Sequence, residues 1–227
     1  MLGAQGGETL LDLVERGVSA AAAPIHLEGG SVLVTGNGRD LEHDDLAPLA
    51  RHLVQDPRPF LLVLAVESEP EETYAALEAL LRRHRSVLRR YEGGEVLDGP
   101  LTVVLVGQSP LATMEAQRSR YAFAGGGPET LTRRPSTALV PLVRVRYDDL
   151  LAWAGEGELP DEERLALQAA AARAHGQQRT FVVHGAPQER PVWEALLIGG
   201  VDRIEVGPSD GREAKALARF LGRRGER

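Results

Sequence analysis

Residues 60–83 read FLLVLAVESEPEETYAALEALLRR, and this stretch decides the fold that we expect. Its first seven residues, Phe60–Val66, are a continuous apolar run, which is typical of a strand buried on both faces of a sheet. Residues 70–83 predict an amphipathic helix, because proline and acidic residues open it and two arginines close it. A buried strand followed by such a helix is the repeating unit of parallel α/β sheets.

The same alternation continues in both directions from this unit. A strand at 31–35 is expected to form a hairpin with the first strand. The glycine cluster at 36–38 lacks the G-x-G-x-x-G spacing that is typical of an open nucleotide-binding sheet. About seven strand positions suit a single barrel domain over residues 1–227, one strand short of a closed (β/α)8 barrel, with an open doubly wound sheet as the alternative. The expected strands are 18–25, 60–66, 101–106, 121–124, 138–145, 180–184 and 203–206, and the expected helices are 9–16, 44–54, 70–83, 110–118, 161–175, 191–198 and 210–221.

Composition excludes several classes of function. The chain has 227 residues and no cysteine, so thiolate metal sites, disulfide frameworks and cysteine nucleophiles are excluded. A formal net charge of −7 argues against a nucleic-acid partner. Lys215 is the single lysine, which excludes Schiff-base chemistry elsewhere in the chain. Neither a signal peptide nor an apolar run long enough to span a membrane is evident, so the expected location is cytoplasmic.

An ordered series of short motifs resembles one enzyme superfamily over almost the whole chain. The series is similar to the bacterial branch of the phosphatidylinositol-phospholipase-C-like and glycerophosphodiester phosphodiesterase superfamily. The motifs are LLD at 10–12, GVS at 17–19, GGSVLV at 29–34, FLLV at 60–63, TYAAL at 73–77, ALVPLV at 138–143, YDDLLAW at 147–153, GEG at 155–157, AHG at 174–176, PVWEALL at 191–197 and GVDRI at 200–204.

This resemblance implies a TIM-type barrel that cleaves phosphodiesters with two histidines and a divalent cation held by carboxylates. The residues that would do so are replaced here. Ala21 and Ala23 stand where the superfamily has metal-binding acids, and Asn37 stands where it has a catalytic histidine. Leu64 and Val66 replace a carboxylate and a lysine, and the histidines of the first strand are absent. The resemblance therefore implies a lipid-metabolism scaffold without catalytic residues, metal or cofactor.

We interpret the chain as a pseudoenzyme that binds a small phosphate-containing anion or a protein. Asn37, Arg144, Arg146 and His184 are the candidate ligand-binding residues, because the last three end expected barrel strands. The competing interpretation of both arginines is an ion pair with Asp148, Asp149 or Glu205, and that of His184 is a packed residue. The competing function is a phosphoric diester hydrolase with altered ligands such as Glu67, Glu205 or Asp40.

The beginning of the sequence bears on the expected partner. Most of the superfamily's first strand is missing, so the barrel is expected to be incomplete there, and an incomplete barrel leaves unpaired strand edges. We expect residues 1–5 to fill part of the gap, or a second copy of the chain or another protein to cover it as a dimer partner.

Overall fold

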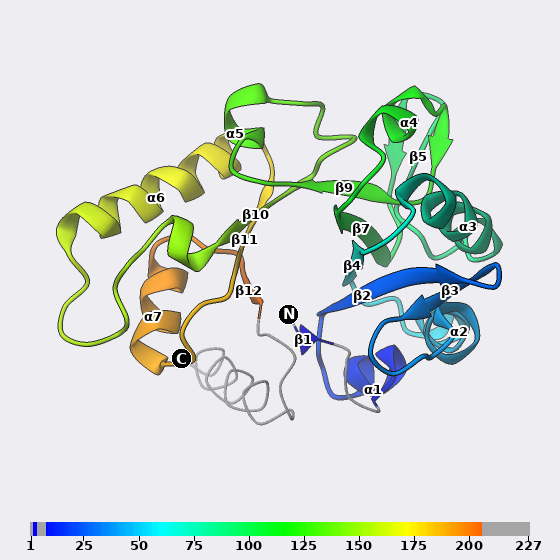
Figure 1. Ribbon diagram of the computed structural model, residues 1–227, viewed down its shortest axis with the longest axis horizontal. Helices are drawn as coiled ribbons and strands as arrows, with labels where there is room; N and C mark the ends of the chain where they lie inside the picture. The colour runs from blue at the N-terminus through cyan, green and yellow to red at the C-terminus, as the bar shows by residue number, and fades with distance from the viewer. Residues whose placement is uncertain (1, 4–7, 206–227) are drawn as a thin grey trace.

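Eight parallel strands, following one another in chain order, form a curled sheet in this computed structural model, which describes residues 2–3 and 8–205 (Figure 1). A ninth strand, β3 (Ser31–Val34), pairs antiparallel with the second strand, which confirms the expected hairpin. The parallel strands are β1 (Leu2–Gly3), β2 (Ala20–Glu28), β4 (Phe60–Val66), β7 (Leu101–Gly107), β9 (Phe123–Gly126), β10 (Leu142–Arg146), β11 (Thr180–His184) and β12 (Arg203–Glu205).

Helices follow the strands and lie on the outer side of the curl (Figure 1). The expected helix at 44–54 opens with a π-helical turn, η1 (Leu41–Leu46), which Asp40 caps. The expected helix at 210–221 lies outside the described residues. The α-helices are α1 (Leu10–Glu15), α2 (Ala47–Gln55), α3 (Pro70–Arg83), α4 (Leu111–Ala116), α5 (Thr130–Arg133), α6 (Asp161–Gly176) and α7 (Arg190–Ile198), and η2 (Tyr147–Asp149) is a 3₁₀ turn.

The short strands differ most from the sequence-based expectation. The segment after α3 folds into a separate three-stranded sheet of β5 (Arg90–Glu92), β6 (Glu95–Leu97) and β8 (Ser119–Arg120), which the alternation did not predict. The expected strand at 121–124 is displaced to β9, and the strand expected from residue 138 begins only at Leu142. Residues 136–140 form a hydrogen-bonded turn there, and Pro141 has no amide hydrogen for a ladder.

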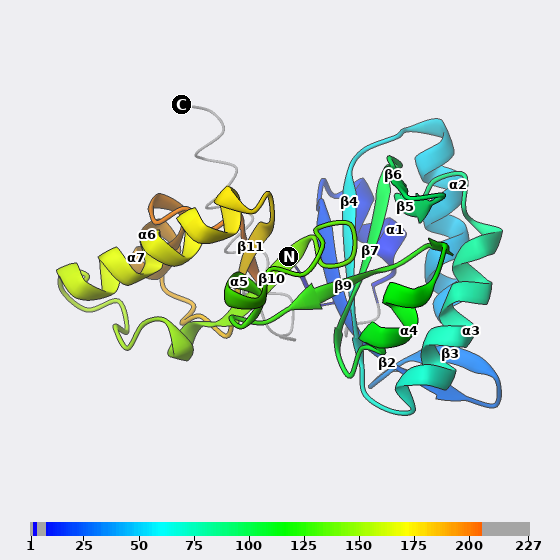
Figure 2. The same ribbon diagram turned by 90° about the horizontal axis from the view of Figure 1, so that it is seen from above.

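Each strand of the curl presents alternate side chains to two different cores. On the outer face, β2, β4 and β7 share a buried cluster with α1–α3, and β10–β12 share another with α6 and α7, so Figure 2 shows two groups of elements joined through β9. The inner face has its own apolar cluster, which spans both groups: Ala20, Leu61, Val63, Val104, Val106, Phe123, Leu142 and Val182. β4 is buried on both faces, as its composition indicated.

The two ends of the strand order approach each other. Leu2 and Gly3 pair in parallel with Ala21 and Ala22, so a two-residue strand occupies the place expected for residues 1–5. Arg203 of the last strand donates from Nη1 to the Oγ of Ser19, just before β2, over 3.3 Å. This contact shows how far the sheet curls. Among the helices of the described ranges, none has the length and apolar character needed to cross a membrane.

Candidate functional site

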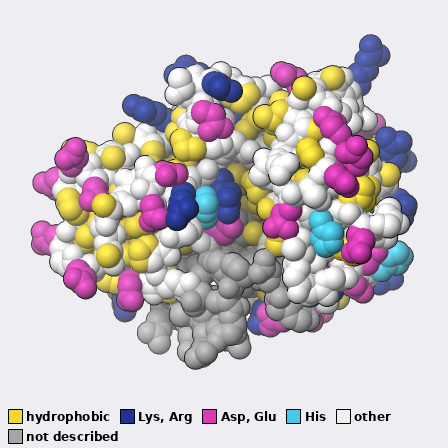
Figure 3. Space-filling model, in the orientation of Figure 1, with side chains coloured by type: hydrophobic (Ala, Val, Ile, Leu, Met, Phe, Trp, Pro, Cys, Tyr) yellow, Lys and Arg dark blue, Asp and Glu magenta, His cyan; other side chains and the backbone are white. Residues whose placement is uncertain are grey.

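Charged side chains gather where β10, β11 and β12 end. Arg146 pairs in register with His184, and His184 pairs with Glu205, so these residues lie at one level on adjacent strands. Arg144 lies two residues before Arg146 and therefore projects to the same face. In Figure 3 a histidine lies between basic side chains, above acidic ones, over the region where Figure 1 draws these strands. The structure thus brings together three of the four candidate ligand-binding residues.

Both arginines form the ion pairs that were the competing interpretation. Arg144 donates from Nε and Nη2 to the two carboxylate oxygens of Glu205, over 2.7 and 2.8 Å. This planar, two-point contact is partly buried, with 26% and 13% of the side chains exposed. Arg146 donates to Asp148, but both side chains are more than 60% exposed, so that pair contributes little stability.

His184 ends β11, as expected for a residue at the mouth of a barrel, and its side chain is partly buried. Burial lowers the pKa of this imidazole below its ordinary value, and the neighbouring positive charge of Arg144 lowers it further. Glu205 acts in the opposite direction but does not restore the pKa. At neutral pH His184 is therefore an uncharged group that can donate one hydrogen bond and accept another.

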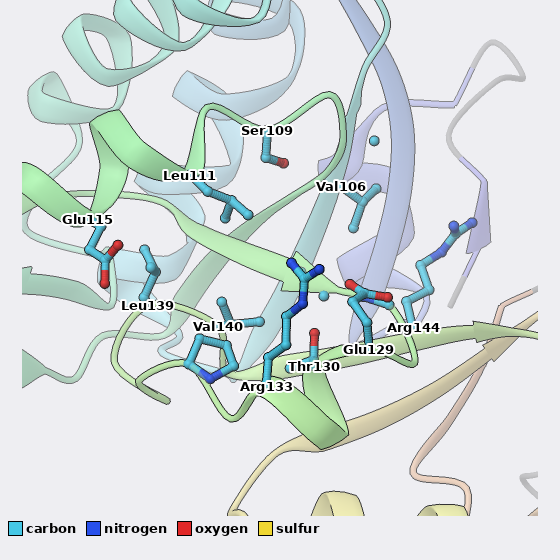
Figure 4. A pocket seen from close by; sticks show the side chains of 15 residues that line it. Val106, Ser109, Leu111, Glu115, Glu129, Thr130, Arg133, Leu139, Val140 and Arg144 are labelled. Carbon is cyan, nitrogen blue, oxygen red and sulfur yellow. The ribbon is translucent and has the colours of Figure 1, made fainter.

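A cavity of about 420 Å³ adjoins Arg144 on the side of β9 and β7 (Figure 4). Its wall combines apolar side chains with two arginines, two glutamates, a serine and a threonine. In Figure 4, Arg133 extends from α5 into this space with the carboxylate of Glu129 beside it. The lining residues are Val106, Gly107, Ser109, Leu111, Glu115, Gly125, Gly126, Gly127, Glu129, Thr130, Arg133, Pro135, Leu139, Val140 and Arg144.

Three consecutive glycines shape the wall of this cavity. A Cβ on Gly126 would lie 1.8 Å from the Oγ1 of Thr130, and one on Gly125 would lie 2.7 Å from a methyl carbon of Val106. Only glycine therefore lets β9 run so close to α5 and β7. The amide of Gly127 donates to Glu129 over 3.0 Å, which orders the turn into α5. The sequence analysis did not single out this run, although Gly-Gly-Gly-Pro after an expected strand was a usable signal.

Two polar groups of the cavity have no hydrogen-bond partner among the described residues. The Oγ of Ser109 is shielded from solvent and makes no hydrogen bond there. Arg133 is exposed, and no ion pair links it to any carboxylate of residues 8–205. Arg144 differs, because Glu205 already neutralises it. A ligand in the cavity could therefore contact the guanidinium of Arg133, the hydroxyl of Ser109 and the guanidinium of Arg144, whose charge Glu205 partly neutralises.

Asn37 lies apart from the other candidates in the strand order. It is in the exposed turn after β3, where its Oδ1 accepts from the amide of Arg39 over 3.1 Å. β3 pairs with β2, and β4, β7 and β9 separate β2 from β10. Asn37 is therefore a turn residue, and the structure does not bring it together with the other three candidates.

The positions identified as lost catalytic residues face the helices. Ala21, Ala23, Leu64 and Val66 all belong to the outer cluster that contains α1–α3. The inner face of the same strands carries Ala22 and Ala65, which pack against the inner cluster, and Pro24 alternates with Ala23. These four positions therefore do not face the interior of the curl, where the site residues of a barrel lie. The inner positions of β2 from Ala20 to Pro24, and those of β4 up to Ala65, carry no acid, whereas Glu28 lies at the exposed end of β2.

Asp40, one of the acids considered as an alternative ligand, and the nearby Asp45 both have structural roles. Asp40 accepts from the amides of Glu42 and His43 as the cap of η1. Asp45 is buried, accepts from the amide of Leu10 over 2.9 Å and pairs with Arg39. Across residues 2–3 and 8–205, no three histidine, aspartate or glutamate side chains lie close enough together to hold a metal ion. Comparison with known proteins found no matching family model and no matching curated protein.

Proposed function

We propose that the chain is a TIM-type barrel related to the phosphodiesterase superfamily that binds a small phosphate-containing anion without cleaving it. The observation that supports this most is the cavity of about 420 Å³ beside Arg144 at the carboxyl end of the parallel strands. Ligands of open and closed parallel sheets bind at this end, because the loops that follow the strands meet there. Eight parallel strands in chain order are compatible with the barrel.

Arginine chemistry supports an anion as the ligand. A guanidinium presents a planar fork that matches two oxygens of a phosphate or carboxylate. Glu205 holds the guanidinium of Arg144 in place through Nε and Nη2, which leaves Nη1 to donate to a ligand oxyanion. Arg133 adds a cation from the opposite wall, and neutral His184 adds a hydrogen-bond donor at the mouth. Arg146 is exposed and would attract anions toward this edge.

The apolar part of the wall supports a ligand larger than phosphate itself. Leu111, Leu139 and Val140 also line the cavity, among the charged residues (Figure 4). A phosphate monoester or diester with a small organic group would contact both kinds of side chain, and its apolar atoms would add binding free energy by leaving water. Hydrolysis is not part of the proposal, because the inner positions Ala22 and Pro24 of β2 and Ala65 of β4 carry no ionisable group.

The test is a binding panel. Glycerol phosphate, inositol phosphate, inorganic phosphate and a glycerophosphodiester are titrated into the protein while thermal unfolding is followed. We expect at least one organophosphate to raise the melting temperature, as mass action requires of a ligand that binds the folded state. R144M should weaken that ligand at least tenfold, whereas R51M, which removes an exposed arginine on α2, should not.

Two other results would replace this proposal. Turnover of the glycerophosphodiester that depends on calcium or magnesium and stops with a chelator would identify a phosphoric diester hydrolase with altered ligands. No response to any anion, together with self-association or a protein partner, would favour the interpretation as a protein-binding module.

A further inference from the structure

A second cavity, of about 150 Å³, lies at the opposite, amino end of the same parallel strands. Residues that begin or precede β4, β7, β10, β11 and β12 surround it, with Pro59, Pro100 and Pro141 among them. Arg89 and Arg203 are its charged residues, and none of the described residues that line it is acidic. The charged residues of this cavity are therefore all basic, whereas the cavity at the carboxyl end also includes Glu115 and Glu129.

Arg203 places a positive charge on the inner face of the curl, where no carboxylate of residues 8–205 forms an ion pair with it. It lies two residues before Glu205 on β12 and therefore shares the inner face, while Ile204 packs outward. Within residues 8–205 its hydrogen bond is to the Oγ of Ser19, over 3.3 Å, and no carboxylate lies within ion-pair distance. Burial lowers the pKa of Arg203, which reflects the cost of keeping this cation away from water.

The neighbouring acid is already engaged. Asp202 precedes Arg203, but its Oδ2 accepts from the amide of Phe181 over 2.7 Å and contacts the Nε2 of His175 over 3.0 Å. Its carboxylate therefore holds β12 against β11 and α6, and it only partly offsets the charge of Arg203, whose pKa stays below its ordinary value.

Arg89 brings a second guanidinium to the same cavity. Its guanidinium carbon lies 5.4 Å from the ring centre of Phe123, which belongs to the inner cluster, so the side chain reaches the inner end of the sheet. Its Nε is shielded from solvent and makes no hydrogen bond. The carboxylate of Asp98 is 3.5 Å away but 94% exposed, so this ion pair is weak. Gly99 permits the approach, because a Cβ there would lie 2.4 Å from the backbone carbon of Leu88.

We propose that this amino-end cavity is a second anion site, which binds a compact tetrahedral oxyanion such as inorganic phosphate or sulfate between Arg89 and Arg203. Thr102 and Thr180 line the cavity and supply hydroxyl donors. The volume of about 150 Å³ suits a compact oxyanion with a few waters. This site stands on its own residues and does not depend on the function proposed above.

The experiment titrates sodium sulfate against R144M at constant ionic strength, while thermal unfolding is followed. R144M weakens the carboxyl-end cavity, and the part of the remaining sulfate-dependent rise in melting temperature that R203M then removes reports on the amino end, because general stabilisation by sulfate is the same in both variants. We expect that rise to persist in R144M and to need at least tenfold more sulfate once R203M is added. R203K should restore part of the affinity, because it keeps the charge without the planar fork.

R203M also has an expected effect without anion. Because a partly buried cation without a carboxylate in ion-pair distance among residues 8–205 is removed, R203M should unfold at the same or a higher temperature than the unmutated chain in sulfate-free buffer. A structural arginine would instead lower that temperature. If R203M fails to fold, R89M replaces it in the titration, because Arg89 lies at the partly exposed rim. Equal sulfate responses with and without these arginines, or no response in R144M, would overturn the proposal.

Discussion

Arg144 and Glu205 join through two parallel hydrogen bonds, of 2.7 and 2.8 Å, across a gap of 61 residues in the sequence. Their strands do not pair directly, because β11 lies between β10 and β12. Arg144 is level with Val182 on β11, and Glu205 is level with His184, so the arginine reaches diagonally over β11. The pair therefore holds the last three strands together at the mouth of the proposed anion site.

Glu205→Gln should separate the two roles of this pair. Arg144 would lose its counter-charge, which should destabilise the fold by about 1–3 kcal/mol, because a partly buried charged group loses its partner. The freed fork should bind an organophosphate more tightly than in the unmutated chain. Urea denaturation measures the first effect and calorimetric titration the second. Weaker binding in E205Q would show that the glutamate itself contacts the ligand.

Glu78 should be important for stability, although it lines neither of the two cavities. It is buried on α3, and one of its oxygens accepts from the amides of Tyr121 and Ala122, over 2.9 and 3.1 Å. Glu78→Leu leaves both amides unpaired and should cost about 2–4 kcal/mol of unfolding free energy. Glu78→Gln keeps an acceptor oxygen and should cost less. Equal losses in urea denaturation would assign the effect to volume and not to hydrogen bonding.

The same residue predicts a pH dependence. Burial raises the pKa of Glu78 above its ordinary value of 4.5, so the folded state holds this proton more tightly than the unfolded state. Stability from this group is complete below about pH 4.5 and is lost as pH rises through the folded pKa. As the pH rises from about 4.5 through the folded pKa of Glu78, the unmutated chain should therefore lose unfolding free energy relative to E78Q. A difference between the two proteins that stays constant with pH would contradict this.

His184 predicts the opposite dependence. Its folded pKa lies below 6.5 because of burial and Arg144, so stability present above about pH 6.5 is lost as pH falls through the folded pKa. H184Q should lack this loss, whereas H52Q, a substitution on α2, should keep it. Arg146, Glu205 and Asp149 also act on the imidazole. Addition of an organophosphate should raise the pKa of His184 in an NMR titration if the anion binds beside it.

Gly126→Ala tests the close approach of β9 to α5. The new Cβ would meet Thr130 at 1.8 Å and Val140 at 3.0 Å, so either the backbone or Thr130 has to move. We expect a loss of about 1–3 kcal/mol, as for other overpacked sites, and weaker binding in the adjoining cavity. Gly176→Ala is the matched control, because nothing lies within 4 Å of a Cβ there. Equal melting temperatures for the two variants would contradict this account.

The site was only partly predictable from sequence. The ends of β10 and β11 were predictable because apolar runs stop there and arginine or histidine follows, so Arg144 and His184 were identified correctly as neighbours at one edge. The carboxyl-end cavity was not identified, because its wall comes from segments on β7, α4, β9 and α5 and from the loop before β10. The amino-end cavity depends on Arg89 and Arg203, which only the curl of the sheet brings to one opening.

The sequence by itself determined the order of strands and helices, because each buried strand and each amphipathic helix carries its own local periodicity. Phe60–Val66 and Pro70–Arg83 keep their expected bounds for this reason. Tertiary structure decided which side of each strand faces inward. Ala21 and Leu64 contact helices, whereas Arg144 and Arg203 face the interior, since a shift of one residue exchanges the faces and apolar runs fit either register. It also decided which charges meet, because Arg144 and Glu205 become partners only after the sheet curls.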